Sequence, residues 1–157
     1  MMRFVVRLFP LAYILLVAAY TTPEPQQQTG FEIETTAELA EEKIVPGKAT
    51  SKTVLALLDS AQSAAQSGQL HTAEAQLERA LRIEPRNAVL WHYMAKLRLH
   101  QSRLPEAIGL AAKSNTLAGQ NRTLRADNWR IIAHARQRSG DEKGARAAQL
   151  KVDSLSK

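Results

Sequence analysis

The strongest constraint on the fold is a short pattern that recurs three times after residue 50. The segments 68–73, 102–107 and 140–145 align, and each ends in alanine. These alanines are 34 and 38 residues apart, so the second interval is longer by about one helical turn of ~3.6 residues. Trp91 and Trp129 are also 38 residues apart. Repetition at this period is typical of stacked helical hairpins.

The residues around these repeats resemble the tetratricopeptide repeat. Ser67 to Trp91 is similar to the second helix of one repeat and the start of the next, and Pro85 stands at the family's inter-repeat proline. The family's pattern of two large residues and a small one occurs twice: Trp91, Met94 and Ala95, then Trp129, Ile132 and Ala133. The resemblance covers residues 54 to about 155. It implies an all-α fold, an antiparallel helix-turn-helix (TPR-like) α-α superhelix of about three repeats with both tryptophans in the core.

The composition argues against an enzyme. The chain has no cysteine, which excludes disulfides, thiolate zinc sites and cysteine nucleophiles. It also lacks an HExxH motif, a glycine-rich phosphate loop and a nucleophile elbow. Its four histidines are spread over three repeats, and no two of them have the i, i+4 spacing that would place a pair of metal ligands on one helix face. We therefore expect no catalytic residues, no metal and no cofactor.

The first residues have the features of a secretion signal. Arg3 and Arg7 precede the apolar run Leu8 to Ala19, which is short for a membrane span but fits a signal-peptide core. We expect residues 1–19 to form a signal peptide cleaved after Ala19; an uncleaved membrane anchor is the alternative.

The same region resembles the lipobox of bacterial lipoproteins. Tyr20 stands where that motif has its acylated cysteine. A phenol cannot form the thioether, so no lipidation is expected for this sequence. A related chain with cysteine there would be an outer-membrane lipoprotein facing the periplasm. We expect an exported, periplasmic protein, and attachment to the outer membrane through a signal or lipid anchor stays open.

Charge divides the remaining chain into two parts. Residues 21–47 carry six acidic residues and one lysine, a net charge of −5. Residues 48–157 carry eighteen basic and nine acidic residues, a net charge of +9. We predict a flexible acidic linker over 20–49 and a TPR-like helical domain over 50–157, with repeats at about 54–87, 88–121 and 126–157.

The resemblance also implies where a partner binds. Family members bind through the concave face, which the first helix of each repeat lines. Carried onto this chain, that face presents a basic stripe on two of these helices: His92, Lys96, His100, Arg130, His134 and Arg138. We predict that these side chains bind carboxylates of an acidic protein or peptide, arginine through paired hydrogen bonds. The alternative is that they are ordinary exposed charges.

These features predict a protein–protein interaction scaffold or adaptor of the periplasm and outer membrane that assists assembly of envelope complexes. A self-associating structural protein is an alternative, with a homodimer formed through Leu150, Val152 and Leu155. The charge of +9 would also suit a nucleic-acid-binding module. The signal sequence argues against that alternative, so no nucleic acid is expected as a partner.

Overall fold

The computed structural model describes Ile44, Pro46, Gly47 and residues 49–157. The predicted signal peptide, Tyr20 and most of the predicted linker lie outside the described residues.

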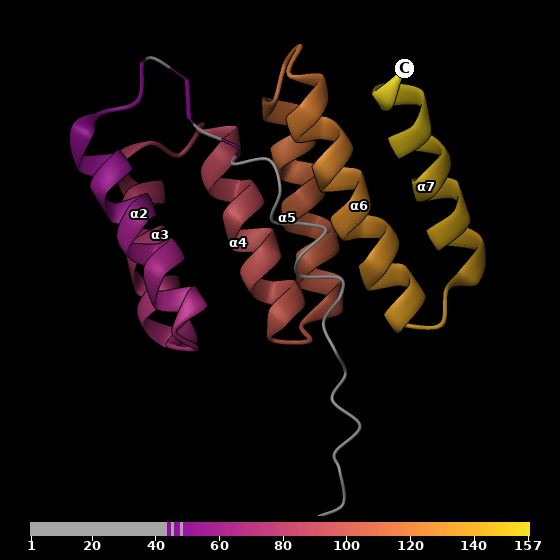
Figure 1. The fold of residues 1–157 in the computed structure, drawn as a ribbon, viewed down its shortest axis with the longest axis horizontal. Coiled ribbons are helices and arrows are strands. Elements are labelled where there is room, and N and C mark those ends of the chain that lie inside the picture. The colour runs from indigo at the N-terminus through magenta and orange to yellow at the C-terminus, as the bar shows by residue number, and fades with distance from the viewer. Residues whose placement is uncertain (1–43, 45, 48) are drawn as a thin grey trace, which may run out of the picture. The chain divides into compact units, whose positions relative to one another are not determined.

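All regular secondary structure in the described part is α-helical, which confirms the all-α expectation. The six helices are α2 (Lys52–Gln66), α3 (Leu70–Ile83), α4 (Ala88–His100), α5 (Leu104–Leu117), α6 (Arg122–Arg138) and α7 (Glu142–Ser156). Consecutive pairs form three antiparallel hairpins, α2–α3, α4–α5 and α6–α7 (Figure 1). This is the TPR-like helical repeat fold that the resemblance implies.

The three hairpins close with the same turn. Gly68, Ser102 and Gly140 occupy equivalent positions, and their φ angles are 74°, 59° and 82°. In each hairpin the next residue donates its N–H to the carbonyl five residues earlier, at 2.8, 2.9 and 2.9 Å. This pattern of a left-handed residue and a long backbone hydrogen bond ends a helix and satisfies its last carbonyl groups. Ser102 shows that the second repeat keeps the geometry without glycine.

Polar side chains determine where four helices begin. Ser51, Asn87, Asn121 and Asp141 each accept a hydrogen bond from a backbone N–H in the first turn of the helix that follows. Such N-caps satisfy donors that have no partner within the helix. Because Asn121 caps α6, this helix begins at Arg122.

Small side chains let the helices approach closely. Ala73, Ala80, Ala95 and Ala107 are fully or almost fully buried. Larger buried side chains fill the space between hairpins, including Leu90 of α4 and Leu124 of α6. One hairpin cannot bury its own apolar face, so the core becomes continuous only when hairpins stack.

The expectation of two core tryptophans is met only in part. Trp91 and Trp129 are both half-buried. Trp129 packs against the core of the second and third hairpins. The indole N–H of Trp91 donates to the carbonyl of Pro85 at 2.8 Å, so this ring packs beside the loop between α3 and α4.

The two junctions between hairpins differ. Helix α5 packs extensively on α6, and α4 also contacts α6, whereas the contact between α3 and α4 is smaller. The first hairpin is therefore joined to the stack over less surface than the third. Within the described residues, we found no helix with the length and apolar character needed to cross a bilayer.

The hairpin turns yield a first prediction. Gly140→Ala should lower the free energy of unfolding by about 1 to 2 kcal/mol, because a residue with a β-carbon is strained at positive φ. Gly109→Ala is the matched control: neither β-carbon would meet an atom within 4 Å, but Gly109 lies inside α5. That change should raise stability by about 0.8 to 1.0 kcal/mol. Urea denaturation followed by circular dichroism measures both, and equal effects of the two changes would contradict this account of the turn.

Candidate protein-interaction surface

The first helices of the three hairpins, α2, α4 and α6, carry the candidate binding face. The six predicted residues differ in their exposure to solvent. His100 and Arg138 are exposed, and Lys96, Arg130 and His134 are half-buried. His92 is only 3% exposed.

Three of the predicted residues, Lys96, His100 and Arg138, lie close together where α4 and α6 end. Burial lowers the pKa of His100, and the positive charges of Lys96 and Arg138 lower it further. Charges shift a pKa mainly at separations of ~4–6 Å, so α4 and α6 bring Lys96, His100 and Arg138 together into a cationic cluster. With its lowered pKa His100 is neutral at pH 7, so Lys96 and Arg138 carry the charge of this cluster.

Arg138 has a structural role within this cluster. Its guanidinium donates to the carbonyl of Leu99 and to the hydroxyl of Ser102, both at 2.8 Å. These contacts tie the end of α6 to the last turn of α4, where carbonyl groups have no helical partner and a positive charge is favourable. The guanidinium has five N–H groups, so donors remain for a second acceptor.

Acidic side chains make the charge vary along the face. Asp127 of α6 forms an ion pair with Arg130. Burial lowers the pKa of Lys96, and the charge of Asp127 partly offsets that effect. Asp59 of α2 and Asp127 both raise the pKa of Tyr93, although burial is the larger cause. The face is therefore mixed near Tyr93 and cationic toward the ends of α4 and α6.

Tyr93 is a central residue of this face that the sequence analysis did not identify. Its ring lies 5.9 Å from the Lys96 ammonium nitrogen and packs edge-on against His92 at 5.2 Å. Its hydroxyl donates to the carbonyl of Ile44 at 3.1 Å. The available signal was its spacing three residues before Lys96, which places both side chains on one side of a helix.

His92 is part of a buried polar network and is not presented to a partner. Its Nδ1–H donates to the amide oxygen of Asn128 at 2.9 Å. The amide group of Asn128 donates to the hydroxyl of Ser114 at 2.7 Å and to the side-chain oxygen of Asn115 at 3.1 Å. Burial lowers the pKa of His92 to about 4. The residue is thus neutral at pH 7 and joins α4 to α6, which corrects its predicted role in binding carboxylates.

Comparisons with known proteins agree with this geometry. A family model described as tetratricopeptide repeat matches residues 54–97. The globular C-terminal domain of P. aeruginosa LpoP is 38% identical to this chain, with a TM-score of 0.64; the match covers 66% of this chain and 97% of that domain. The chain belongs to the tetratricopeptide repeat family.

A second solved structure supports the fold alone. The N-terminal domain of stress-induced protein-1 (STI-1) from C. elegans is 16% identical, with a TM-score of 0.59, and the match covers 71% of this chain and all of that domain (100%). A search of curated proteins found no match. Tetratricopeptide repeats are protein-interaction modules with an extended binding surface.

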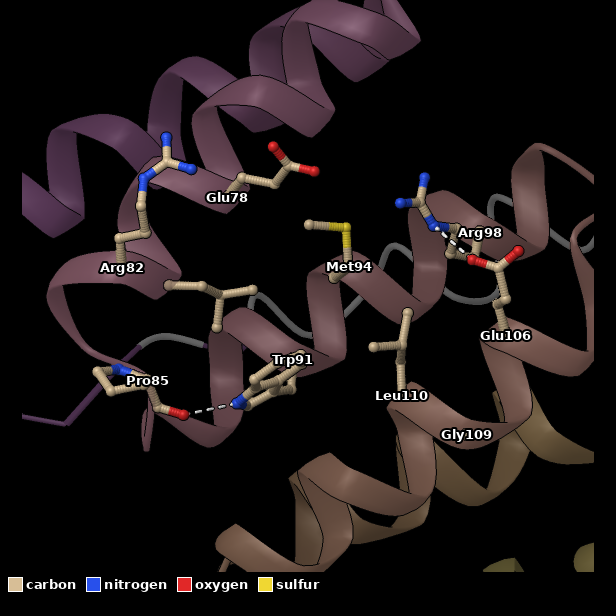
Figure 2. Close-up of a pocket in the computed structure, with 10 residues that line it drawn as sticks. Glu78, Arg82, Pro85, Trp91, Met94, Arg98, Glu106, Gly109 and Leu110 are labelled. Atoms are coloured by element: carbon tan, nitrogen blue, oxygen red, sulfur yellow. Dashed lines mark hydrogen bonds and ion pairs between the residues drawn. The ribbon is translucent and has the colours of Figure 1, made fainter.

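The opposite side of the tetratricopeptide stack carries a pocket. Its volume is about 650 Å³, and residues of α3, α4 and α5 line it. Figure 2 shows Trp91 and Met94 of α4 between the α3 side chains and Leu110 of α5, with charged residues at the rim. None of the six predicted residues lies in this pocket. It exists where the second helices of the first two repeats do not pack closely.

Arg98 closes one end of this pocket and connects three helices. Its guanidinium lies 2.5 Å from a carboxylate oxygen of Glu74 on α3 and 3.3 Å from one of Glu106 on α5. The hydrogen bond from Arg98 lowers the pKa of Glu74 to about 2. The first junction of the tetratricopeptide repeats therefore depends on charge pairing.

Metal binding and self-association depend on two other features of the described part of the chain. It holds no group of three or more histidine, aspartate or glutamate side chains placed to bind a metal ion. Of the three residues suggested for self-association, Leu150 is 69% exposed, Leu155 is half-buried and Val152 is only 4% exposed. The apolar end of the stack is therefore smaller than the sequence suggests, and a single exposed leucine is ordinary for a soluble surface.

The buried histidine yields a second prediction. In the unfolded chain His92 takes up a proton near pH 6.5, but in the folded protein only near pH 4. The unfolded state therefore binds more protons between these values, and stability should fall by up to about 3 kcal/mol as pH drops from 6.5 to 4. Urea denaturation at several pH values measures this loss.

The matched control for that prediction is His92→Asn, which keeps a side-chain N–H donor but does not titrate. The other histidines contribute equally to both proteins. The variant should show a flatter dependence of stability on pH over this range. Parallel curves for the two proteins would show that His92 does not cause the acid sensitivity.

Proposed function

We propose that this chain is a non-enzymatic adaptor of the bacterial cell envelope. It binds an extended, carboxylate-bearing segment of a partner protein on the face formed by α2, α4 and α6. The observation that carries the proposal is the cationic cluster, in which two successive repeats place the charges of Lys96 and Arg138 beside the neutral imidazole of His100.

The chemistry of this cluster suits a carboxylate. A carboxylate can accept two parallel hydrogen bonds from an arginine, and Lys96 adds a second positive charge nearby. Half-burial of Lys96 limits screening by salt, which strengthens its attraction to an anion compared with a fully solvated lysine. Binding is expected to weaken as ionic strength rises.

The envelope location rests on the amino-terminal segment. Two arginines followed by an apolar run of signal-peptide length precede the helical domain. In P. aeruginosa LpoP the matching domain is the carboxyl-terminal one, and here too the matching repeats follow an amino-terminal stretch. We propose that residues 1–19 direct export and that the repeats act in the periplasm, where they assist assembly of an envelope complex.

Site-specific crosslinking in the native host tests the binding face. A photoreactive amino acid at Gln137 of α6, on the proposed face, should give a discrete adduct with a partner protein. The same amino acid at Arg79 of α3 should not, because α3 contributes to the opposite side. Adducts of equal yield from both positions would contradict the proposed face.

Charge reversal then tests the role of the cations. Lys96→Glu/Arg138→Glu should reduce the yield of the Gln137 adduct at least tenfold, because two attractions become repulsions. Arg82→Glu/Lys113→Glu changes the net charge equally but alters α3 and α5, so it should leave the yield unchanged. Circular dichroism of both variants checks that they are folded. Equal losses of adduct yield in both variants would show that overall charge, and not the position of Lys96 and Arg138, causes the effect.

A further inference from the structure

A residue from outside the helical repeats lies on the proposed binding face. Ile44 precedes α2 in the sequence, yet its side chain is only 7% exposed and packs with the apolar core shared by α2, α3 and α4. Its carbonyl oxygen accepts the hydrogen bond from the Tyr93 hydroxyl at 3.1 Å. Burial in this core and a hydrogen bond to its backbone thus hold Ile44 against the repeats.

The described residues that connect Ile44 to α2 are also held in place. The N–H of Thr50 donates to the carbonyl of Gly47 at 3.0 Å, which forms a turn. The hydroxyl of Thr50 accepts a hydrogen bond from Asn87 at 3.1 Å, and the N–H of Ser51 donates to a carboxylate oxygen of Glu84 at 2.8 Å. These contacts fix the turn to the loop between α3 and α4, so Ile44 is attached to the repeats at short range.

Ile44 covers the part of the face that lies beside the cationic cluster. The side chain of Tyr93 interacts with Asp59 and Gln62 of α2 and with Asp127 of α6, so its hydroxyl lies among the three first helices. Lys96, which belongs to the cationic cluster, packs over the ring of the same tyrosine. The contact made by Ile44 is therefore continuous with the surface proposed to bind a partner.

We propose that Ile44 is an internal occupant of a peptide-binding subsite. The subsite takes an aliphatic side chain from an extended segment, and the Tyr93 hydroxyl donates to the backbone carbonyl of that residue. A partner segment of the same chemistry must displace Ile44 to bind. The role of a partner rests on the proposed function, whereas the docking of Ile44 does not.

Charge complementarity supports the same occupant. Residues 21–47, which include Ile44, have a net charge of −5, and residues 48–157 have a net charge of +9. The chain's own segment thus combines an aliphatic residue with nearby acids in sequence, the composition proposed for the partner. Attachment to α2 gives the internal segment a high effective concentration, so a weak intrinsic contact is sufficient to hold it.

The first test measures whether Ile44 is docked. Because the chain has no cysteine, Ile44→Cys places a single thiol in the full-length protein. This thiol should react with a water-soluble disulfide reagent at least tenfold more slowly than the thiol of Ala49→Cys, whose position is exposed. Adding Tyr93→Phe should speed the reaction at position 44 about fivefold, as expected for one lost hydrogen bond, and leave position 49 unchanged.

A measurement on the unmodified chain guards against undocking caused by the cysteine itself. Nuclear Overhauser contacts between the Ile44 methyl groups and the Tyr93 ring should be present in the wild-type protein. Their absence, together with equal thiol reactivity at positions 44 and 49, overturns the proposal.

The second test asks whether the vacated subsite recognises this chemistry. A blocked synthetic peptide with the sequence of residues 38–50 should shift the Tyr93 resonances of the full-length Ile44→Ser protein. At least tenfold more peptide should be needed for the wild type. A peptide with serine at the position of Ile44 should have no effect on either protein. An equal response of both proteins to the first peptide, or no response of either, overturns the subsite.

Neither test needs the partner, so the two proposals can fail separately. If no adduct forms through Gln137 but Ile44 is docked and displaceable, the adaptor role fails and the subsite stands. If the adduct forms and depends on Lys96 and Arg138 while Ile44 is undocked, the adaptor role stands and the internal occupant fails.

Discussion

The packing of the third hairpin on the second depends on the buried amide of Asn128. This side chain accepts a hydrogen bond from His92 and donates to Ser114 and Asn115, so it connects α4, α5 and α6. The hydroxyl of Ser114 in turn donates to the carbonyl of Ala88. A buried polar group without a partner costs more than its hydrogen bond contributes, so Asn128 keeps its hydrogen bonds only when the second and third hairpins have one relative position. The alignment of α4 and α6, and with it the cationic cluster, follows from that position.

The first junction uses a different chemistry and is more open. Arg98 pairs with Glu74 and Glu106, while α3 and α4 share less contact than α5 and α6. Charged groups keep part of their hydration and pack less closely than apolar side chains. This junction therefore has a pocket near Trp91, which closer apolar packing would fill. Ile44 adds apolar contact on the other side of the same junction. The first hairpin is thus joined to its neighbour by a smaller contact than the third hairpin is.

The recurring alanines and the proline were sufficient to predict three helical hairpins, because helix packing of this kind requires small residues at a fixed period. The start of α6 at Arg122 follows from the cap at Asn121, which depends on local hydrogen bonds that a repeat pattern does not encode. The family resemblance placed His92 on the binding face but could not show that Asn128 covers it, because that contact joins residues 36 positions apart. Ile44 lacked any signal: a lone isoleucine in an acidic segment becomes informative only when its contact with Tyr93 is known.

Some charged residues of the face have donors left for a ligand, and others are paired within the protein. Charge alone was therefore a poor guide to which residues could bind a partner. Arg138 holds α4 and α6 together and still has donors for a ligand, whereas Arg130 is paired with Asp127. Near Tyr93 the acids of α2 and α6 offset the cations, so attraction to an anion is strongest toward the ends of α4 and α6. An extended segment on this surface would therefore meet two environments in sequence, an apolar contact at Tyr93 and a cationic one beyond Lys96. Such a surface selects for the order of residues in a ligand as well as for its net charge, because reversing the segment would place its carboxylates beside Asp59 and Asp127.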